Sequence, residues 1–239
     1  MDRDALRRAC LAAIGSLAFL ATAPTAIAAA ETADEFVART NAELADLLLE
    51  LNAAQWTQAT YITADTQLMS AKAYERYLAF FGRTVEEAKR FEGQPMSAAA
   101  KRSIALLKLG VSAPAPDDPA KRAELATLLA GMEAKYGTAK YCKAGGQDCR
   151  DEVQLKAVME KSRDYDELLD AWAGWHDQAR GLRGDYTRFT ELANEGARTF
   201  GYADVGAMWR SNYDMPADDF AREAARLYSQ VEPLYKDLE

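Results

Sequence analysis

Residues 165–179 read Tyr-Asp-Glu-Leu-Leu-Asp-Ala-Trp-Ala-Gly-Trp-His-Asp-Gln-Ala, and this stretch decides the fold class. Its large apolar side chains recur at steps of three or four residues, which is the spacing of one face of an α-helix. The same spacing runs from Thr32 onward, and no run of five or more residues alternates with the period of a half-buried strand. The sequence therefore predicts an all-α fold, with Trp172 and Trp175 in its core.

Capping patterns predict where several helices begin. Thr32 and Glu35 fit a capping box, and Asp118 before Pro119 has the order of an N-cap followed by a proline in the first turn. The capping-box pattern at Thr84 predicts another helix start, after a short break. Acidic pairs are expected in first turns, where carboxylates interact favourably with the helix dipole. These pairs are Glu86-Glu87, Asp117-Asp118 and Asp218-Asp219.

Two further segments have distinctive patterns. Three prolines between Gly110 and Pro119 predict the clearest loop of the chain. In the last segment, apolar residues continue at steps of four and three to the end of the chain, with no Gly, Asn or basic turn to end a helix. They are Phe220, Ala224, Leu227, Val231, Leu234 and Leu238. We therefore expect a truncated part of a larger helical domain, and a helix that frays at a natural terminus is the alternative.

The composition excludes several classes of function. The chain has 239 residues, of which 49% are hydrophobic and 28% charged, as is typical of a folded globular protein. With 37 acidic and 29 basic side chains its net charge is −8 at pH 7, which is the wrong sign for binding DNA or RNA through the phosphate backbone. Its single histidine, His176, excludes any site that needs two imidazoles from this chain.

Residues 1–30 have the pattern of a secretory signal peptide. Charged side chains stop at Arg8, residues 9–30 form an uncharged run, and two Ala-x-Ala patterns meet at Ala28. We therefore expect a cleaved signal peptide and a protein exported to the periplasm or secreted. An uncleaved membrane anchor is the alternative, and the pair Arg7-Arg8 leaves both the general secretory and the twin-arginine routes open.

Cys142 and Cys149 remain after such a cleavage, with Gly145 and Gly146 between them. Glycines allow the tight reversal that brings two thiols together, and an exported protein can keep a disulfide. The alternative is a metal site, but two thiolates without a nearby histidine or a second cysteine pair do not fill four tetrahedral positions. We favour a structural disulfide that closes a hairpin.

Several short motifs occur together along the chain. The most specific are Trp172-Ala-Gly-Trp175, Phe200-Gly-Tyr-Ala-Asp204 and Trp209-Arg-Ser-Asn-Tyr213. Further matches are Gln55-Trp56, Tyr61-Ile-Thr63, Met132-Glu133 with Tyr136, Ser162-Arg-Asp-Tyr165 and Glu232-Pro-Leu-Tyr235. In this order and spacing, residues 34–239 resemble the angiotensin-converting-enzyme family of zinc peptidyl-dipeptidases, which are gluzincin metallopeptidases.

The resemblance implies a large helical domain with a deep channel. Residues 31–239 would be the N-terminal part of this catalytic domain, and residues 34–110 would be its lid helices. The family holds Zn²⁺ through two histidines of an H-E-x-x-H helix and a downstream glutamate, and the motif glutamate activates water. That motif lies C-terminal of the Trp-Arg-Ser-x-Tyr element in family members. The resemblance thus implies zinc for the complete enzyme, with no metal ligand and no catalytic residue in this chain.

Three residues are carried over from the family by position. Tyr213 matches a tyrosine that helps to hold an activating chloride through a buried phenol, and packing at a helix end is its alternative role. His176 stands where the family has an arginine of a second chloride site, and a mostly neutral imidazole is a poor substitute for a guanidinium. An ordinary core or surface histidine is the alternative there. Glu152 matches an acid that faces a substrate side-chain pocket, with Asp151 as the alternative match.

The prediction is therefore the N-terminal part of an exported zinc metallopeptidase that removes C-terminal dipeptides from oligopeptides, and this chain alone is expected to be inactive. Chloride is a candidate second ligand. The partner of the complete enzyme would be an oligopeptide substrate, with no nucleic acid, and a membrane would be contacted only through an uncleaved signal segment. The alternative is a self-contained, non-catalytic helical protein of the cell envelope that binds or interacts with other molecules.

Overall fold

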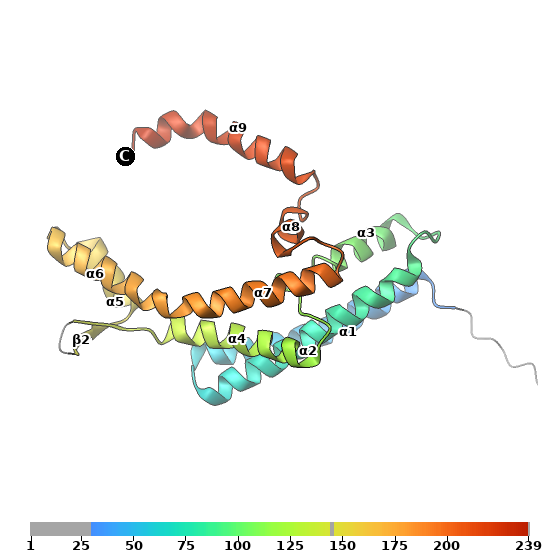
Figure 1. The fold of residues 1–239 in the computed structure, drawn as a ribbon, viewed down its shortest axis with the longest axis horizontal. Coiled ribbons are helices and arrows are strands. Elements are labelled where there is room, and N and C mark those ends of the chain that lie inside the picture. Colours follow the sequence, from blue (N-terminus) through green and yellow to red (C-terminus); the bar gives the residue numbers. More distant parts are fainter. Residues whose placement is uncertain (1–29, 144–145, 239) are drawn as a thin grey trace, which may run out of the picture. The chain divides into compact units, whose positions relative to one another are not determined.

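The computed structural model describes residues 30–143 and 146–238, which form helices and one small hairpin (Figure 1). The α-helices are α1 (Ala33–Thr60), α2 (Ala64–Ala88), α3 (Ala98–Leu107), α4 (Pro119–Gly137), α5 (Glu152–Lys161), α6 (Tyr165–Ala179), α7 (Arg183–Thr199), α8 (Val205–Arg210) and α9 (Ala217–Lys236). Two 3₁₀ turns, η1 (Lys89–Phe91) and η2 (Arg180–Leu182), follow α2 and α6. The strands are β1 (Tyr141–Lys143) and β2 (Gln147–Arg150). The predicted all-α fold class is confirmed.

Two expectations concern the membrane and export. Within the part of the chain that the structure describes, no helix combines the length and the apolar character needed to cross a bilayer. The predicted signal peptide, residues 1–30, lies outside the described residues except for Ala30, so it stays a prediction.

Two of the predicted helix starts have the expected caps. At α1, the Thr32 hydroxyl accepts a hydrogen bond from the Glu35 backbone N–H at 3.2 Å, and the Glu35 carboxylate accepts one from the Thr32 N–H at 2.9 Å. At α4, the Asp118 carboxylate accepts from the Ala120 N–H at 2.7 Å, and Pro119 is the first helical residue. Each cap stabilises its helix by about 1 kcal/mol, because it pairs N–H groups that have no partner within the helix.

The predicted helix start at Thr84 is wrong, because α2 runs without a break through Gly82 and Thr84. The Thr84 hydroxyl donates to the carbonyl of Phe80 at 2.7 Å, one turn earlier in the same helix. Glu86 and Glu87 consequently lie in the last turns of α2 and not in a first turn. The apolar face of α2 is buried across this region, and that burial outweighs the local capping signal.

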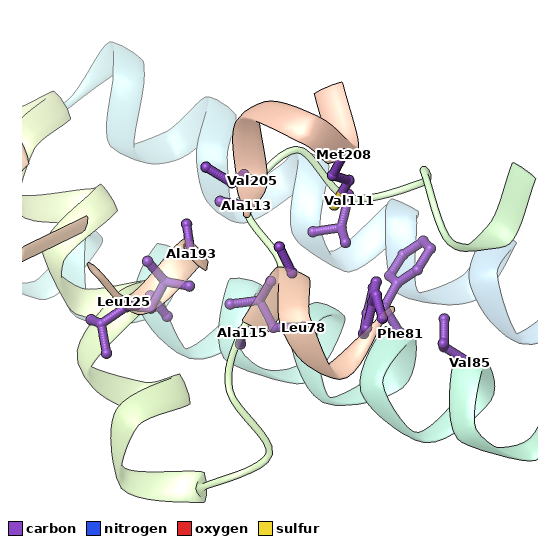
Figure 2. Close-up of a cluster of buried hydrophobic side chains, with 14 of the residues drawn as sticks. Leu78, Phe81, Val85, Val111, Ala113, Ala115, Leu125, Ala193, Val205 and Met208 are labelled. Atoms are coloured by element: carbon purple, nitrogen blue, oxygen red, sulfur yellow. The ribbon is translucent and has the colours of Figure 1, made fainter. Parts of the chain in front are cut away.

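The main core gathers side chains from α2, α4, α7, α8 and the loop between α3 and α4 (Figure 2). Its buried members include Leu78, Phe80, Phe81, Val85, Val111, Leu125, Leu192, Ala193, Val205 and Met208. Burying one large apolar side chain contributes about 1.5–3 kcal/mol, so this cluster is the principal source of stability. A second cluster packs the start of α1 against the end of α2, η1 and α3, and the rings of Phe36 of α1 and Phe91 of η1 lie 5.1 Å apart.

Residues 111–116 cross this core as a loop, and Pro114 and Pro116 are fully buried. A buried loop normally leaves backbone N–H groups without partners, but proline has no N–H to satisfy. Gly196 of α7 packs directly on this loop, since a Cβ added there would lie 2.1 Å from the Pro114 carbonyl oxygen. The predicted loop is confirmed, and its position inside the core is a finding of the structure.

α6 packs through a glycine, and its first tryptophan is not in the core. Tyr141 of β1 lies so close to Gly174 that a Cβ added there would be 2.5 Å from the tyrosine ring. Trp172 is 53% exposed, so the prediction that it belongs to the core is wrong. Trp175 is partly buried and meets Tyr136 edge to face, with ring centroids 5.5 Å apart. Because Gly174 has no side chain, Tyr141 can pack closely against its side of α6. Trp172 lies on a side of α6 that the described residues leave exposed.

The hairpin between α4 and α5 has the predicted disulfide. β1 and β2 pair antiparallel, with Cys142 opposite Cys149, and their sulfurs are bonded at 1.98 Å. Gly146 in the turn has φ +73°, a left-handed conformation that glycine adopts without a steric cost.

We predict that Gly196→Ala lowers the free energy of unfolding by about 1–3 kcal/mol, because the new methyl group collides with the backbone of the buried loop. Gly131→Ala in α4 is the matched control. A Cβ at this position meets no neighbouring atom within 4 Å, and alanine stabilises a helix by up to about 1 kcal/mol relative to glycine. Urea denaturation measures both variants. Equal midpoints would contradict the close contact between α7 and the loop.

We also predict that replacing Cys142 and Cys149 together by serine lowers the free energy of unfolding by about 2–3 kcal/mol, because a disulfide that closes a short loop restricts the unfolded chain. Urea denaturation under non-reducing conditions measures the loss. Reducing agent should lower the midpoint of the wild type and leave the double variant unchanged. An effect of the reductant on the variant would show that another group is responsible.

Candidate functional site

Two adjoining hollows, of about 500 and 460 Å³, lie between α1, α2, α4 and the loop of residues 111–116. Both are lined by Gln55, Tyr74 and Ser112, so they form one depression, which we name the central groove. Polar groups in its larger half come from Gln55, Ser70, Tyr74, Ser112, Glu133 and Tyr136. Hydroxyl and amide groups with a carboxylate beside apolar walls suit a polar, extended ligand such as a peptide.

Two phenols form one wall of the central groove. Tyr74 and Tyr77 lie one turn apart on α2, and their rings stack with centroids 5.6 Å apart. Burial raises the pKa of Tyr74 to about 12; the neighbouring Tyr77 adds to the rise, and a hydrogen bond with the Ser112 side chain opposes it. Burial also raises the pKa of Tyr77, whose hydroxyl donates to the Gly110 carbonyl at 2.8 Å. Both phenols therefore stay protonated at neutral pH, where they act as hydrogen-bond donors and not as bases.

The Trp209 side chain of α8 fixes the loop that forms the floor of the groove. Its indole N–H donates to the Ser112 carbonyl at 2.6 Å, although the two residues are 97 positions apart in sequence. Trp209 is the first residue of the Trp-Arg-Ser-x-Tyr motif. The motif therefore has a structural role at the groove that its spacing alone does not reveal.

Behind the groove, a buried glutamine ties α1 to α4. Gln58 is completely buried, and its side-chain amide donates to the Ala130 carbonyl at 2.9 Å. The Gln58 carbonyl oxygen has no hydrogen-bond partner among the described residues. A buried unpaired acceptor is costly, so the hydrogen bond to Ala130 offsets only part of the cost of burying this amide.

Asp151 and Glu152 are the two acids matched to a substrate pocket, and Asp151 is the N-cap of α5. Its carboxylate accepts from the Gln154 N–H at 2.9 Å, and the Gln154 side chain accepts from the Asp151 N–H at 3.0 Å. Glu152 is the first residue of α5 and is exposed. Glu152 is therefore the carboxylate that remains available to a ligand, and its role in binding stays a prediction.

His176 and Tyr213, the two residues matched to chloride sites, both contact aromatic rings. His176 is exposed, its Nδ1 lies 2.7 Å from the Trp172 carbonyl, and its ring stacks on Trp172 at 4.0 Å. Tyr213, between α8 and α9, is 50% exposed and stacks on Phe220 at 3.8 Å. The expected buried phenol at Tyr213 is therefore not found, and ring packing accounts for its position. Chloride binding at either residue stays a prediction.

The described structure does not gather the three matched residues into one site. No hydrogen bond or ring contact within residues 30–143 and 146–238 joins any two of Glu152, His176 and Tyr213. His176 instead lines a hollow of about 710 Å³ with Arg180 and Arg183. This hollow shares Tyr136, Leu182 and Tyr186 with the central groove, so Arg180 and Arg183 lie beside one end of the groove. Arg180 forms an ion pair with Asp177 at 2.8 Å.

The described residues do not fit a zinc site. They contain no cluster of three or more His, Cys, Asp or Glu side chains placed to hold a metal ion. The whole sequence has one histidine, and the described pair of cysteines is joined in the disulfide. A catalytic zinc needs three protein ligands and an open position. No reaction step can therefore be assigned to a metal held by these residues.

Sequence reasoning did not predict the central groove. Gln55 and Glu133 belong to motifs that support the family resemblance, whereas Tyr74 and Ser112 belong to none of them. Two tyrosines three residues apart on an apolar helix face indicate that hydroxyl groups lie at the margin of that face, because a buried tyrosine normally places its hydroxyl where it finds a hydrogen-bond partner. The two tyrosines become candidate site residues only because the loop that carries Ser112 lies beside them. The structure shows this arrangement, and the sequence alone does not predict it.

We predict that Tyr74 destabilises the fold at alkaline pH. Because its folded pKa of about 12 lies above the ordinary value of 10.0, its contribution to stability is complete below pH 10 and is lost between pH 10 and 12. Tyr74→Phe should reduce this loss, whereas Tyr165→Phe, at a residue that is 74% exposed, should not. Urea denaturation at pH 9 and pH 11.5 measures both variants. An identical pH dependence for Tyr74→Phe and the wild type would contradict the shifted pKa.

Comparisons with known proteins agree with the motifs. The family model of angiotensin-converting enzyme, peptidase M2, matches residues 27–239. The chain is 33% identical over 217 residues to angiotensin-converting enzyme of Sus scrofa, a match that covers 86% of this chain and 16% of that protein. It is 34% identical over 211 residues to the enzyme of Oryctolagus cuniculus, with 85% and 16% covered. The chain thus spans about one sixth of the length of these curated relatives. On this evidence of sequence, the chain belongs to the angiotensin-converting enzyme family of peptidases.

Proposed function

We propose that this chain is the N-terminal part of an exported zinc peptidyl-dipeptidase and forms a wall of the substrate channel. The zinc ligands would come from polypeptide outside these 239 residues. The observation that carries the proposal is the family match over residues 27–239 in a chain whose described residues do not fit a zinc site. The complete enzyme would remove C-terminal dipeptides from oligopeptides, and this chain alone would cleave none.

The central groove supports a role in binding peptides. An extended peptide presents a backbone N–H and C=O at almost every residue, and each of these needs a partner when it leaves water. The phenols of Tyr74 and Tyr136 and the amide of Gln55 supply donors, and Glu133 supplies an acceptor. The guanidinium group of Arg183, in the hollow that adjoins one end of the groove, would suit a peptide carboxylate.

The groove is compatible with the lid assignment, which comes from the family resemblance. α1, except for its first residue Ala33, and α2 lie within residues 34–110, and both contribute residues to the groove. In the proposed enzyme these helices would cover the channel and limit entry to small or flexible peptides. The disulfide is compatible with the proposed export, because disulfides persist in oxidising compartments.

The second candidate is a self-contained binding protein that does not catalyse. The observation in its favour is the continuous core that α2, α4, α7 and α8 share within the described residues. Large apolar side chains such as Trp172, Leu227 and Leu234 are, however, about half exposed or more, which disfavours a protein that works alone. Dye binding separates the two, because an isolated part of a larger domain should bind a hydrophobic dye and a self-contained protein should not.

We predict that the purified chain, dialysed after incubation with one equivalent of zinc, retains no stoichiometric metal and releases no dipeptide from a blocked tripeptide. The physical reason is the absence of a three-ligand set from the described residues and of a second histidine from the sequence. Elemental analysis and product chromatography are the measurements. Retained zinc together with dipeptide release would overturn the proposal.

The DNA beyond the codon for Glu239 gives an independent test. An open frame that continues into an H-E-x-x-H motif would support the proposal. A stop codon with no such frame nearby would contradict it and favour the self-contained binding protein.

A further inference from the structure

One half of the central groove is lined without any charged side chain of the described residues. It is the hollow of about 460 Å³ beside α8, and we name it the neutral half. Its polar lining consists of Asn52, Gln55, Tyr74, Tyr77, Ser112 and Asn212. The other half includes the carboxylate of Glu133, and the hollow beyond that half includes the guanidinium groups of Arg180 and Arg183. Charge therefore distinguishes the neutral half from the rest of the depression.

Three side-chain amides in the neutral half are available to a ligand. Asn52 and Gln55 lie three residues apart on α1, which places them on one side of that helix, and Asn212 follows α8. None of the three amides forms a hydrogen bond with another described residue. A primary amide has an acceptor oxygen and an NH₂ donor, so it can pair with both polar groups of a peptide bond.

The aromatic side chains of the neutral half already have partners within the protein. The Tyr77 hydroxyl donates to the Gly110 carbonyl at 2.8 Å, and the Tyr74 hydroxyl is hydrogen-bonded to the Ser112 side chain. The indole N–H of Trp209 donates to the Ser112 carbonyl at 2.6 Å, and Trp209 is 48% exposed. These rings shape the hollow, and the three amides are the groups that a ligand would pair with first.

A charged side chain that entered the neutral half would lose water without gaining a counter-charge. Burial of an ion is tolerated when an opposite charge and hydrogen bonds replace its hydration, and neutral amides supply only part of this. The remaining lining is apolar and includes Leu48, Leu51, Val111 and Met208. An uncharged residue has no such penalty, because its backbone groups can pair with the amides.

We propose that Asn52, Gln55 and Asn212 bind the backbone of the substrate peptide and that the neutral half selects uncharged residues. This inference rests on the proposed function, which leaves open which peptides the groove accepts. It assigns a preference to this chain: the segment of a peptide that crosses the neutral half should carry neither Lys or Arg nor Asp or Glu.

The experiment titrates the full chain with blocked peptides and follows the side-chain NH₂ signals of Asn52 and Asn212 by NMR. The first peptide alternates serine and glutamine, and two others carry lysine or glutamate in place of every glutamine. Because their charges alternate along the chain, no register keeps them out of the neutral half. Physiological salt screens the net charge of −8. We expect the uncharged peptide to shift both signals, and each charged peptide to bind at least about tenfold more weakly.

The variant Asn52→Asp tests the cause of this selection. Its carboxylate supplies the missing counter-charge, so it should bind the lysine peptide at least about tenfold more tightly than the wild type does, and the glutamate peptide no more tightly. Asn41→Asp is the matched control, because Asn41 is exposed on the same helix and does not line the central groove. It adds the same charge and should leave the affinity for the lysine peptide nearly unchanged. A gain of binding cannot result from misfolding.

Several results would overturn the inference. They are unshifted Asn52 and Asn212 signals with the uncharged peptide, a charged peptide that binds the wild type as tightly as the uncharged one, and an equal gain in Asn41→Asp and Asn52→Asp. Backbone N-methylation of the uncharged peptide should weaken binding, and unchanged affinity would contradict recognition of the backbone. A stronger response to maltotriose than to the peptide would show that the neutral half suits a hydroxyl-rich ligand instead.

Failure of this inference can be told apart from failure of the proposed function. If the downstream frame lacks H-E-x-x-H and the chain still selects the uncharged peptide, the proposed peptidase is contradicted and the selection stands. If the frame encodes that motif and the wild type does not discriminate among the peptides, the proposed function is supported and this inference is wrong.

Discussion

The contact between Gly196 of α7 and the carbonyl of Pro114 is the constraint on which the rest of the structure depends. The loop of residues 111–116 fills the space between α2, α4 and α7, so α7 can approach only where it has no side chain. This loop also presents Ser112 to the central groove and receives the indole of Trp209. The same close packing thus sets the distance between the core helices and the position of the groove floor.

The described chain combines a closed core with open helix faces. α2, α4, α7 and α8 share one buried cluster, whereas α9 has no buried residue and α6 presents Trp172 to solvent. Both sets contain amphipathic helices, such as α7 in the core and α9 outside it. What differs is whether the described residues supply a partner for the apolar side. The core therefore stabilises the groove, and in the proposed complete enzyme the open faces would lie against the rest of the domain.

The fold class and several helix ends follow from the sequence because they depend on local signals. Thr32 and Asp118 cap helices whose neighbouring residues also favour a helix start, so prediction and structure agree there. Thr84 has the same local signal but lies within the buried face of α2, and tertiary packing outweighs the cap. Trp172 shows a second limit of prediction from sequence. The helical spacing of apolar residues predicts that one face of α6 is apolar, but it does not predict which residues cover that face.

The candidate site was less predictable than the fold. Glu152, His176 and Tyr213 were located by resemblance, and the described structure does not bring them together. The central groove depends on contacts between distant segments, such as Tyr74 with Ser112 and Trp209 with Ser112, and no spacing in the sequence reports these. A contact between distant residues can be predicted from the sequence only when both residues belong to recognisable motifs. Ser112 belongs to none.

The hydrogen bond from Trp209 to the Ser112 carbonyl also links one of the family motifs to the shape of the groove. Replacing this indole would leave the Ser112 carbonyl without its donor from α8. A change in the motif would therefore alter the groove through the loop of residues 111–116 as well as at Trp209 itself.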